Sequence, residues 1–227
     1  MTRSVLVLSA DRRKSAIDAL SSGASALLLR LGPAGGLARD EARDWARGFI
    51  EAARRRDNRP DIYIQIAGLR SADSEEDVAA LAIAGVDGFF LEGCEGRVDV
   101  QQLSVRLAAR EAEAELAPGA LRIVALAAQT PAGVFALGDY AGASSRLAAL
   151  AMDDAALPAG AAARAMARTL LALGAAAAEV GALDAAPTSR GSALEAACQS
   201  VRRDGFSGLV TAAAGEIPVI NRVFGGP

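Results

Sequence analysis

Short runs of apolar residues alternate with longer amphipathic stretches along this sequence of 227 residues. The runs are nearly continuous in Val, Leu, Ile, Phe and Ala, which is typical of strands buried on both faces of a parallel sheet. Strands that alternate with helices indicate βα units, and eight such units fit a (β/α)8 TIM barrel. The eight predicted strands are Val5–Leu8, Ala26–Leu31, Ile62–Ile66, Gly88–Leu91, Arg122–Leu126, Leu147–Met152, Ala178–Leu183 and Gly208–Ala212.

The stretches between these strands have the periodicity of helices that cover a sheet. A chain of this length suits one barrel of near-minimal size better than two ordinary domains, so we expect residues 1–227 to form a single domain. The seven predicted helices are Arg12–Ser21, Arg39–Arg56, Ser74–Ala84, Val98–Leu116, Pro131–Tyr140, Pro158–Leu173 and Ser192–Arg203.

The composition removes several classes of function. The chain has no histidine, which excludes a Ser-His-Asp triad, a Cys-His dyad and histidine-ligated zinc. Its formal net charge of −3 argues against nucleic-acid binding, which needs a positive field. Acid–base chemistry would therefore fall to Asp, Glu, Lys, Tyr or Cys.

The two cysteines, Cys94 and Cys198, have no metal-type spacing and do not suggest a disulfide framework. The apolar run near the N-terminus is too short for a secretory signal, and no run approaches the length of a membrane span. We therefore expect a cytoplasmic protein that contacts neither membrane nor nucleic acid.

The segment from Gly205 to Phe224 resembles the closing segment of the citrate lyase β-subunit-like family, part of the HpcH/HpaI aldolase superfamily. Members of that family read roughly GFDGKLAIHPAQIAPVNAVF here. The family's Lys, His and Pro fall on Leu209, Ala213 and Ala214 in this chain. The shared frame consists of Gly205, Phe206, Gly208, Ile217, Asn221, Val223 and Phe224. The resemblance implies the scaffold of a magnesium-dependent acyl-CoA lyase.

The first strand and the turn after it resemble the family's RSxLFVPGDRPK. Arg3, Arg12 and Lys14 match, while Ser9 and Ala10 replace the Pro-Gly of the turn. The resemblance implies that Arg3, Arg12 and Lys14 bind substrate, with the basic residues of the turn near the CoA moiety. An ordinary basic helix start explains Arg12 and Lys14 equally well.

Three further strand ends match the family but lack its polar residues. The acidic positions of the family's LDLEDA fall on Arg30, Gly32 and Pro33. Gln65 stands where the family's VWVRIN has the arginine that grips the substrate, and Gly93 replaces the lysine of its VLPK. A glutamine offers neutral hydrogen bonds and no charge, so Gln65 would be a weaker substrate ligand than arginine.

The metal ligands of the family are also altered. Gln129 falls on the glutamate of the family's VPLIETARG, and that glutamate ligates Mg²⁺ in the family. Gln129 is also the last of the candidate substrate-binding residues, after Arg3, Arg12, Lys14 and Gln65. The aspartate of GAEDLA corresponds best to Asp154 and second best to Asp153. Because Mg²⁺ favours carboxylates, we expect weak or absent binding. The alternative is that Asp153 and Asp154 merely cap the loop before Pro158.

These replacements together predict a degraded lyase site on an intact scaffold. The expected function is a non-catalytic structural or regulatory subunit. The alternative is an active carbon–carbon lyase or hydrolase that acts on a CoA thioester or a small oxo or hydroxy acid with an altered site. Such an enzyme would use Asp153, Asp154, Glu92 or Glu216.

The end of the sequence leads to an expectation about partners. Only seven helices are predicted, and the sequence ends at Gly225-Gly226-Pro227, whereas the family continues with an eighth helix and often a lid. A missing helix would leave apolar surface exposed. We therefore expect a homo-oligomer or a complex with an intact homologue.

Overall fold

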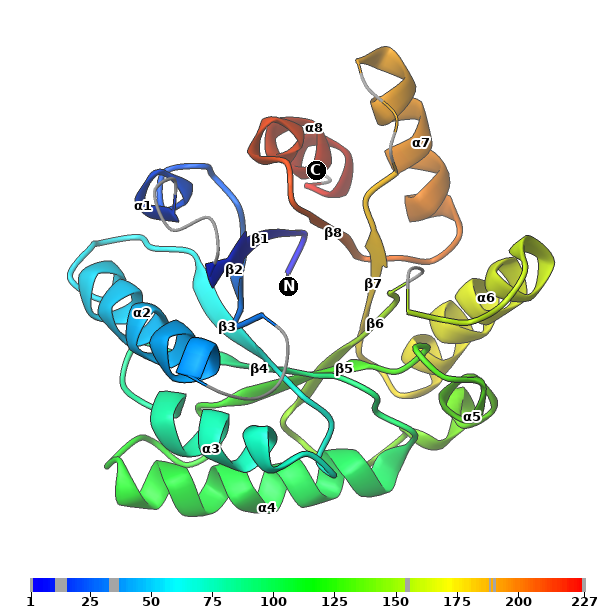
Figure 1. Ribbon diagram of the computed structural model, residues 1–227. Helices are drawn as coiled ribbons and strands as arrows, with labels where there is room; N and C mark the ends of the chain where they lie inside the picture. Colours follow the sequence, from blue (N-terminus) through cyan, green and yellow to red (C-terminus); the bar gives the residue numbers. More distant parts are fainter. Residues whose placement is uncertain are drawn as a thin grey trace.

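The computed structural model describes residues 2–10, 16–32, 37–153, 156–187, 189 and 191–225. All eight predicted strands are present and form a closed parallel barrel, in which each strand pairs with the next and β8 pairs with β1 (Figure 1). The predicted (β/α)8 architecture is therefore confirmed. The strands are β1 (Ser4–Ser9), β2 (Ala26–Arg30), β3 (Asp61–Ile66), β4 (Gly88–Leu91), β5 (Arg122–Leu126), β6 (Leu147–Ala151), β7 (Gly181–Ala185) and β8 (Gly208–Thr211).

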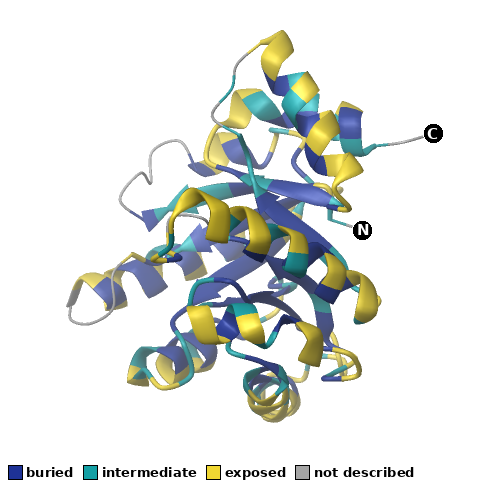
Figure 2. Cartoon of the chain, turned by 90° about the vertical axis from the view of Figure 1, so that its right-hand side faces the viewer, coloured by how far each residue is buried: buried dark blue, intermediate teal, exposed yellow. Residues whose placement is uncertain are grey.

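Helices surround the barrel and turn their apolar sides toward the strands, so that burial decreases outward (Figure 2). The 3-10 turns η2 (Leu137–Asp139) and η3 (Ala214–Glu216) precede β6 and α8. The helices are α1 (Ala16–Ala19), α2 (Leu37–Ala53), α3 (Ala72–Leu81), α4 (Arg97–Glu113), α5 (Pro131–Phe135), α6 (Ala161–Ala177), α7 (Ser192–Arg203) and α8 (Ile217–Phe224).

The hydrophobic core has two layers because successive strand residues point to opposite faces of the sheet. The outer layer lies between the strands and the helices and contains residues such as Leu27, Ile64 and Leu150. The inner layer fills the barrel with Val5, Ala26, Leu28, Tyr63, Phe90, Val124, Leu126, Ala149, Ala151 and Leu183. Inward positions beyond this inner layer therefore open at the carboxyl ends of the strands, where barrel enzymes place their sites.

The expectation that no helix follows the eighth strand is wrong. Helix α8 (Ile217–Phe224) follows η3 and packs against α7, β1 and β8. Ile217, Ile220 and Val223 are buried, which is the one-sided spacing of an amphipathic helix, and Pro218 suits its first turn. Helix α8 therefore covers the apolar surface beside β1 and β8 that a missing helix would have left exposed.

Several boundaries also differ from the sequence predictions by a few residues. Strand β7 begins at Gly181 instead of Ala178 because α6 extends through Ala177 and ends where Glu179 adopts a φ of 57°. The helix predicted over Pro131–Tyr140 is divided into α5 and η2, since Gly133 and Gly138 weaken a continuous helix. The first helix was predicted from Arg12, but residues 11–15 lie outside the described residues.

Cys94 and Cys198 are both buried free thiols. Within the described ranges, none of the helices has the length and apolar character that crossing a membrane requires.

Candidate functional site

Polar side chains ring the barrel axis where four strands end. Arg30 is the last residue of β2, Gln65 lies near the end of β3, Glu92 follows β4, and Asp153 follows β6. Each lies two residues beyond an inner-core residue, namely Leu28, Tyr63, Phe90 and Ala151, so the period of two directs all four inward. They line a cavity of about 320 Å³ together with Ser9, Leu31, Gly32, Arg39 and Ala67.

The first three of these side chains form one hydrogen-bonded row. Arg30 and Gln65 are register partners in the β2–β3 pair, and Arg30 Nε donates to Gln65 Oε1 at 2.7 Å. Gln65 Nε2 in turn donates to Glu92 Oε1. The amide of Gln65 thus links a cation on β2 to a carboxylate after β4. The row places positive charge on β2, where the family resemblance puts an acid.

Gln129 forms a second row one strand further round the barrel. Its Oε1 accepts the backbone N–H of Gly93 at 2.6 Å, and its Nε2 donates to Asp153 Oδ2 at 3.2 Å. Gly93 has a φ of 57°, a left-handed conformation that glycine adopts readily, and this aims its N–H at the amide. Both polar ends of Gln129 therefore have partners.

The described residues do not fit the magnesium ion that the family resemblance implies. Mg²⁺ requires oxygen ligands in octahedral geometry. Here Gln129 Oε1 accepts from Gly93, and the carboxylates of Asp153 and Glu92 accept from glutamine amides. Across the part of the chain that the structure describes, no three acidic or sulfur side chains gather at one point. Asp154, the other candidate ligand, lies outside the described residues.

Arg39, which sequence reasoning missed, brings a second guanidinium to the cavity from the first turn of α2. It is 4% exposed, its Nη1 donates to the Gly32 carbonyl at 2.6 Å, and its other nitrogens bind Asp77 on α3. Asp77 is fully buried and also accepts from Arg43 Nε at 2.8 Å. Burial alone lowers the pKa of Arg43, but Asp77 and the other nearby carboxylates raise it above its ordinary value. The only sequence signal for Arg39 was a charge following the loop after the second strand.

Two titratable groups flank the cavity without entering it. Thr130 donates its hydroxyl to Glu95 at 2.8 Å and, together with Arg70, lowers the pKa of Glu95 below its ordinary value. Burial raises the pKa of the Cys94 thiol to about 11, and Tyr140 donates its hydroxyl to the Cys94 carbonyl at 3.2 Å. A thiol with so high a pKa is not a nucleophile near neutral pH.

The remaining predicted residues do not join this cluster. Arg3 is exposed and immediately precedes β1, where its carbonyl accepts the N–H of Leu209, so it lies at the amino end of the barrel, opposite the cavity. Arg12 and Lys14 lie outside the described residues. Glu216 follows β8 and accepts the hydroxyl of Thr211 at 2.6 Å, and it is absent from the described residues that line the cavity.

Comparison with known proteins places this fold. Neither family models nor curated protein sequences match the chain. RipC from Yersinia pestis is similar at a TM-score of 0.75 and 22% identity, covering 100% of this chain and 96% of that one. The citrate lyase β subunit from Mycobacterium tuberculosis, complexed with oxaloacetate and magnesium, has a TM-score of 0.73 and 20% identity over 98% of this chain and 96% of that one.

Haloferax volcanii malate synthase, in a ternary complex with pyruvate and acetyl-CoA, has a TM-score of 0.79 and 15% identity, covering 100% of this chain and 70% of that one. At such identities the likeness concerns the fold. The fold that the family resemblance implied is therefore found, and the chemistry has to be argued from the side chains themselves.

Proposed function

We propose that this chain is a non-catalytic barrel of the citrate lyase β-like type that acts as a structural or regulatory subunit. The proposal rests on the hydrogen bonds within two rows of residues, Arg30–Gln65–Glu92 and Gly93–Gln129–Asp153. Side chains at the positions of the family's lyase residues therefore form hydrogen bonds with one another.

The chemistry of a lyase explains why these replacements matter. Cleaving a carbon–carbon bond beside a carbonyl leaves an enolate, which needs a metal or several donors to stabilise it. Loss of one such stabiliser typically lowers the rate by ~10²–10³. Gln65 and Gln129 each replace a charged group of the resembled family, and Gly93 replaces a third. We expect these losses together to abolish magnesium-dependent cleavage.

One observation favours the alternative, an active lyase or hydrolase that acts on a CoA thioester or a small oxo or hydroxy acid. Arg30 and Arg39 both line the cavity, with Asp153 and Glu92 on its wall. Arg30 thus brings from β2 a guanidinium that the resemblance places on β3, and a guanidinium suits a carboxylate. A small acid bound there would make the barrel a ligand-responsive subunit even without turnover.

Calorimetry and a turnover assay test the proposal. The protein is titrated with Mg²⁺, oxaloacetate and acetyl-CoA in turn and then incubated with all three while CoA release and carbonyl loss are recorded. We expect no metal binding and no turnover. Turnover above the blank that disappears with Arg30→Ala or with a chelator would overturn the proposal in favour of the alternative.

A subunit needs a partner, and the outer face of α6 supplies a surface for one. Phe135 at the end of α5 is 89% exposed, Met166 is 65% exposed and Leu173 is 62% exposed. The other exposed positions of α6 are uncharged as well: Ala161, Ala162, Ala163, Ala165, Thr169, Ala176 and Ala177. We call Phe135 and these exposed positions of α6 the α6 surface. A water-facing helix side without a charge is unusual and typical of an interface.

A second copy of this chain fits the α6 surface best. Met166 and Leu173 lie two turns apart, so a two-fold axis passing between Thr169 and Leu170 sets Met166 of one protomer against Leu173 of the other. The alanines around them allow close approach, and interfaces between identical chains are the more apolar kind. An intact homologue is the competing partner.

Unpaired buried cysteines favour a cytoplasmic location for the assembly.

A further inference from the structure

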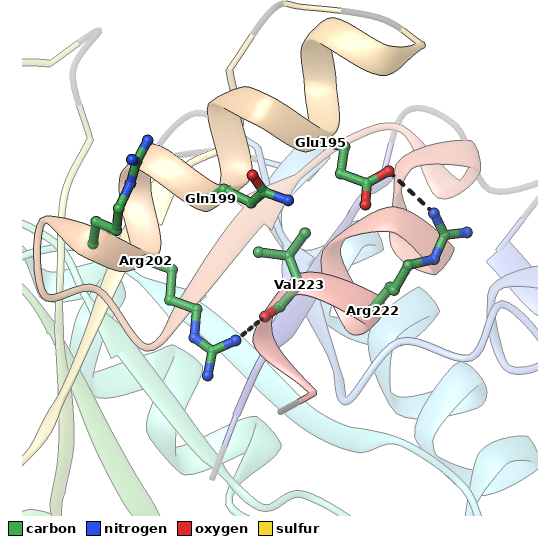
Figure 3. Close-up of a pocket in the computed structure, with 6 residues that line it drawn as sticks. Glu195, Gln199, Arg202, Arg222 and Val223 are labelled. Atoms are coloured by element: carbon green, nitrogen blue, oxygen red, sulfur yellow. Dashed lines mark hydrogen bonds and ion pairs between the residues drawn. The ribbon is translucent and has the colours of Figure 1, made fainter. Parts of the chain in front are cut away.

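A groove of about 580 Å³ runs between α7 and α8 on the outside of the barrel (Figure 3), and it shares no lining residue with the cavity at the strand ends. Glu195 and Gln199 project into it from α7, while Arg222 and Val223 border it from α8. The family resemblance assigns no role to any of these polar side chains. The full set of lining residues is Glu195, Gln199, Arg202, Arg203, Arg222 and Val223.

Two of the three arginines are held at the groove by single contacts. Arg202 Nη1 donates to the carbonyl of Val223 at 2.7 Å, which satisfies a carbonyl in the last turn of α8. Arg222 Nη1 pairs with Glu195 Oε2 at 3.2 Å, and these side chains are 65% and 38% exposed. Each guanidinium keeps further N–H groups available, because arginine has five.

The groove has more donors than acceptors. Arg203 has no hydrogen bond or ion pair with any described residue, and the same is true of the Gln199 side chain in the described ranges. Three guanidinium groups face one carboxylate, a local excess of two positive charges in a chain whose net charge is −3. The groove therefore favours an anion, although the protein as a whole repels one.

We propose that the α7–α8 groove binds the phosphate group of a small metabolite. A guanidinium fork matches two phosphate oxygens, and arginines from both α7 and α8 line the groove. A phosphate monoester carries about −1.5 to −2 charges near neutral pH, which balances the local excess, whereas a single carboxylate would not. The site is separate from the cavity, so it stands whether or not the barrel catalyses a reaction.

Calorimetry of the full chain with inorganic phosphate, glycerol 3-phosphate and acetate tests this site. We expect both phosphates to bind and acetate not to bind, with the comparison of the two phosphates separating a free ion from an ester. Arg203→Gln removes a side chain without described contacts, and we expect phosphate affinity to fall about tenfold. Arg222→Gln should act in the same direction.

Glu195→Gln gives the sharper test because it predicts a gain. Removing the carboxylate that competes for Arg222 should tighten phosphate binding by up to about fivefold. The matched control is Glu113→Gln on α4. Glu113 pairs with Arg110 at 2.6 Å and lies far from the groove residues in sequence. Equal effects of the two variants would show a response to net charge alone and overturn the proposal. Unchanged binding in Arg203→Gln and Arg222→Gln, or no binding of either phosphate, would do the same.

Discussion

The side-chain amide of Gln129 donates to the carboxylate of Asp153 at 3.2 Å, across the gap between the ends of β5 and β6. The family resemblance places a glutamate and an aspartate at or beside these positions, where a divalent cation separates two negative charges. In this chain an uncharged amide faces the carboxylate instead, and a hydrogen bond joins the ends of the two strands.

Gln129→Glu should restore a metal requirement. Without a cation, two carboxylates so close repel one another, so we expect the variant to lose about 1 kcal/mol of unfolding free energy. Adding Mg²⁺ should return that stability, since oxygen ligands of this charge suit the ion. Thermal unfolding with and without magnesium measures both effects.

The control for that prediction is Gln102→Glu, the same chemical change at an exposed position of α4. It should show neither a loss of stability nor a response to magnesium. If the unaltered protein itself were stabilised by millimolar Mg²⁺ as strongly as the Gln129→Glu variant, our view of the site would be wrong.

The apolar pattern was sufficient for the strands but not for every helix. All eight strands coincide with apolar runs because both faces of each strand are buried, as for Ile62 to Ile66. Helix α8 was not among the predicted helices, although Ile217, Ile220 and Val223 have the spacing of an amphipathic helix. Local periodicity was the better guide there.

The site was only partly predictable because contacts between distant segments decide it. Gln65 and Gln129 could be identified from aligned motifs, and both reach the strand ends. Arg39 depends on buried Asp77, 38 residues later, and sequence spacing gives no sign of that pair. Arg3 matched a motif but lies at the amino end of β1, because a motif does not reveal which end of a strand is functional.

Gly174 should be intolerant of substitution although it lies within a helix. A Cβ there would lie 2.2 Å from the backbone oxygen of Leu137, so η2 and α6 would have to separate. We expect Gly174→Ala to destabilise the protein by about 1–3 kcal/mol in urea unfolding, despite the better helix propensity of alanine. In contrast, Gly48→Ala within α2 has open space around its Cβ and should stabilise by up to about 1 kcal/mol. A gain in stability for both would contradict the packing.

Acid should weaken the buried pair between Glu111 and Arg146. Glu111 is 2% exposed and accepts from Arg146 Nη2 at 2.6 Å and from the N–H of Leu121 at 2.8 Å. Burial raises the pKa of Glu111, but these hydrogen bonds outweigh it and hold the pKa below the ordinary 4.5. Because the folded pKa is depressed, the stability from this pair is present above the unfolded pKa and is lost as pH falls through the folded one.

Glu111→Gln isolates that contribution. Near neutral pH it leaves Arg146 buried opposite a neutral amide, and we expect a loss of about 3–5 kcal/mol of unfolding free energy. The difference from the unaltered protein should shrink as the pH falls through the lowered pKa of Glu111, because the carboxyl itself then becomes neutral. Urea unfolding across this range measures it, and a difference independent of pH would contradict the assignment. Glu113→Gln on the exposed side of α4 should change stability by less than about 1 kcal/mol.

The α6 surface should hold two copies of this chain together. Phe135, Met166 and Leu173 stay exposed in the single chain, and burying apolar area yields ~25 cal/mol per Å². We expect sedimentation at micromolar concentration to give twice the chain mass of 23.0 kDa. Met166→Lys combined with Leu173→Lys should give monomers, since each lysine would lose its hydration at the two-fold contact. The matched control is Val105→Lys on α4, which is 71% exposed and should leave the dimer intact. A monomer before any substitution would refute the dimer. A dimer that survives both lysines on α6 but not the one on α4 would show that another face carries the contact.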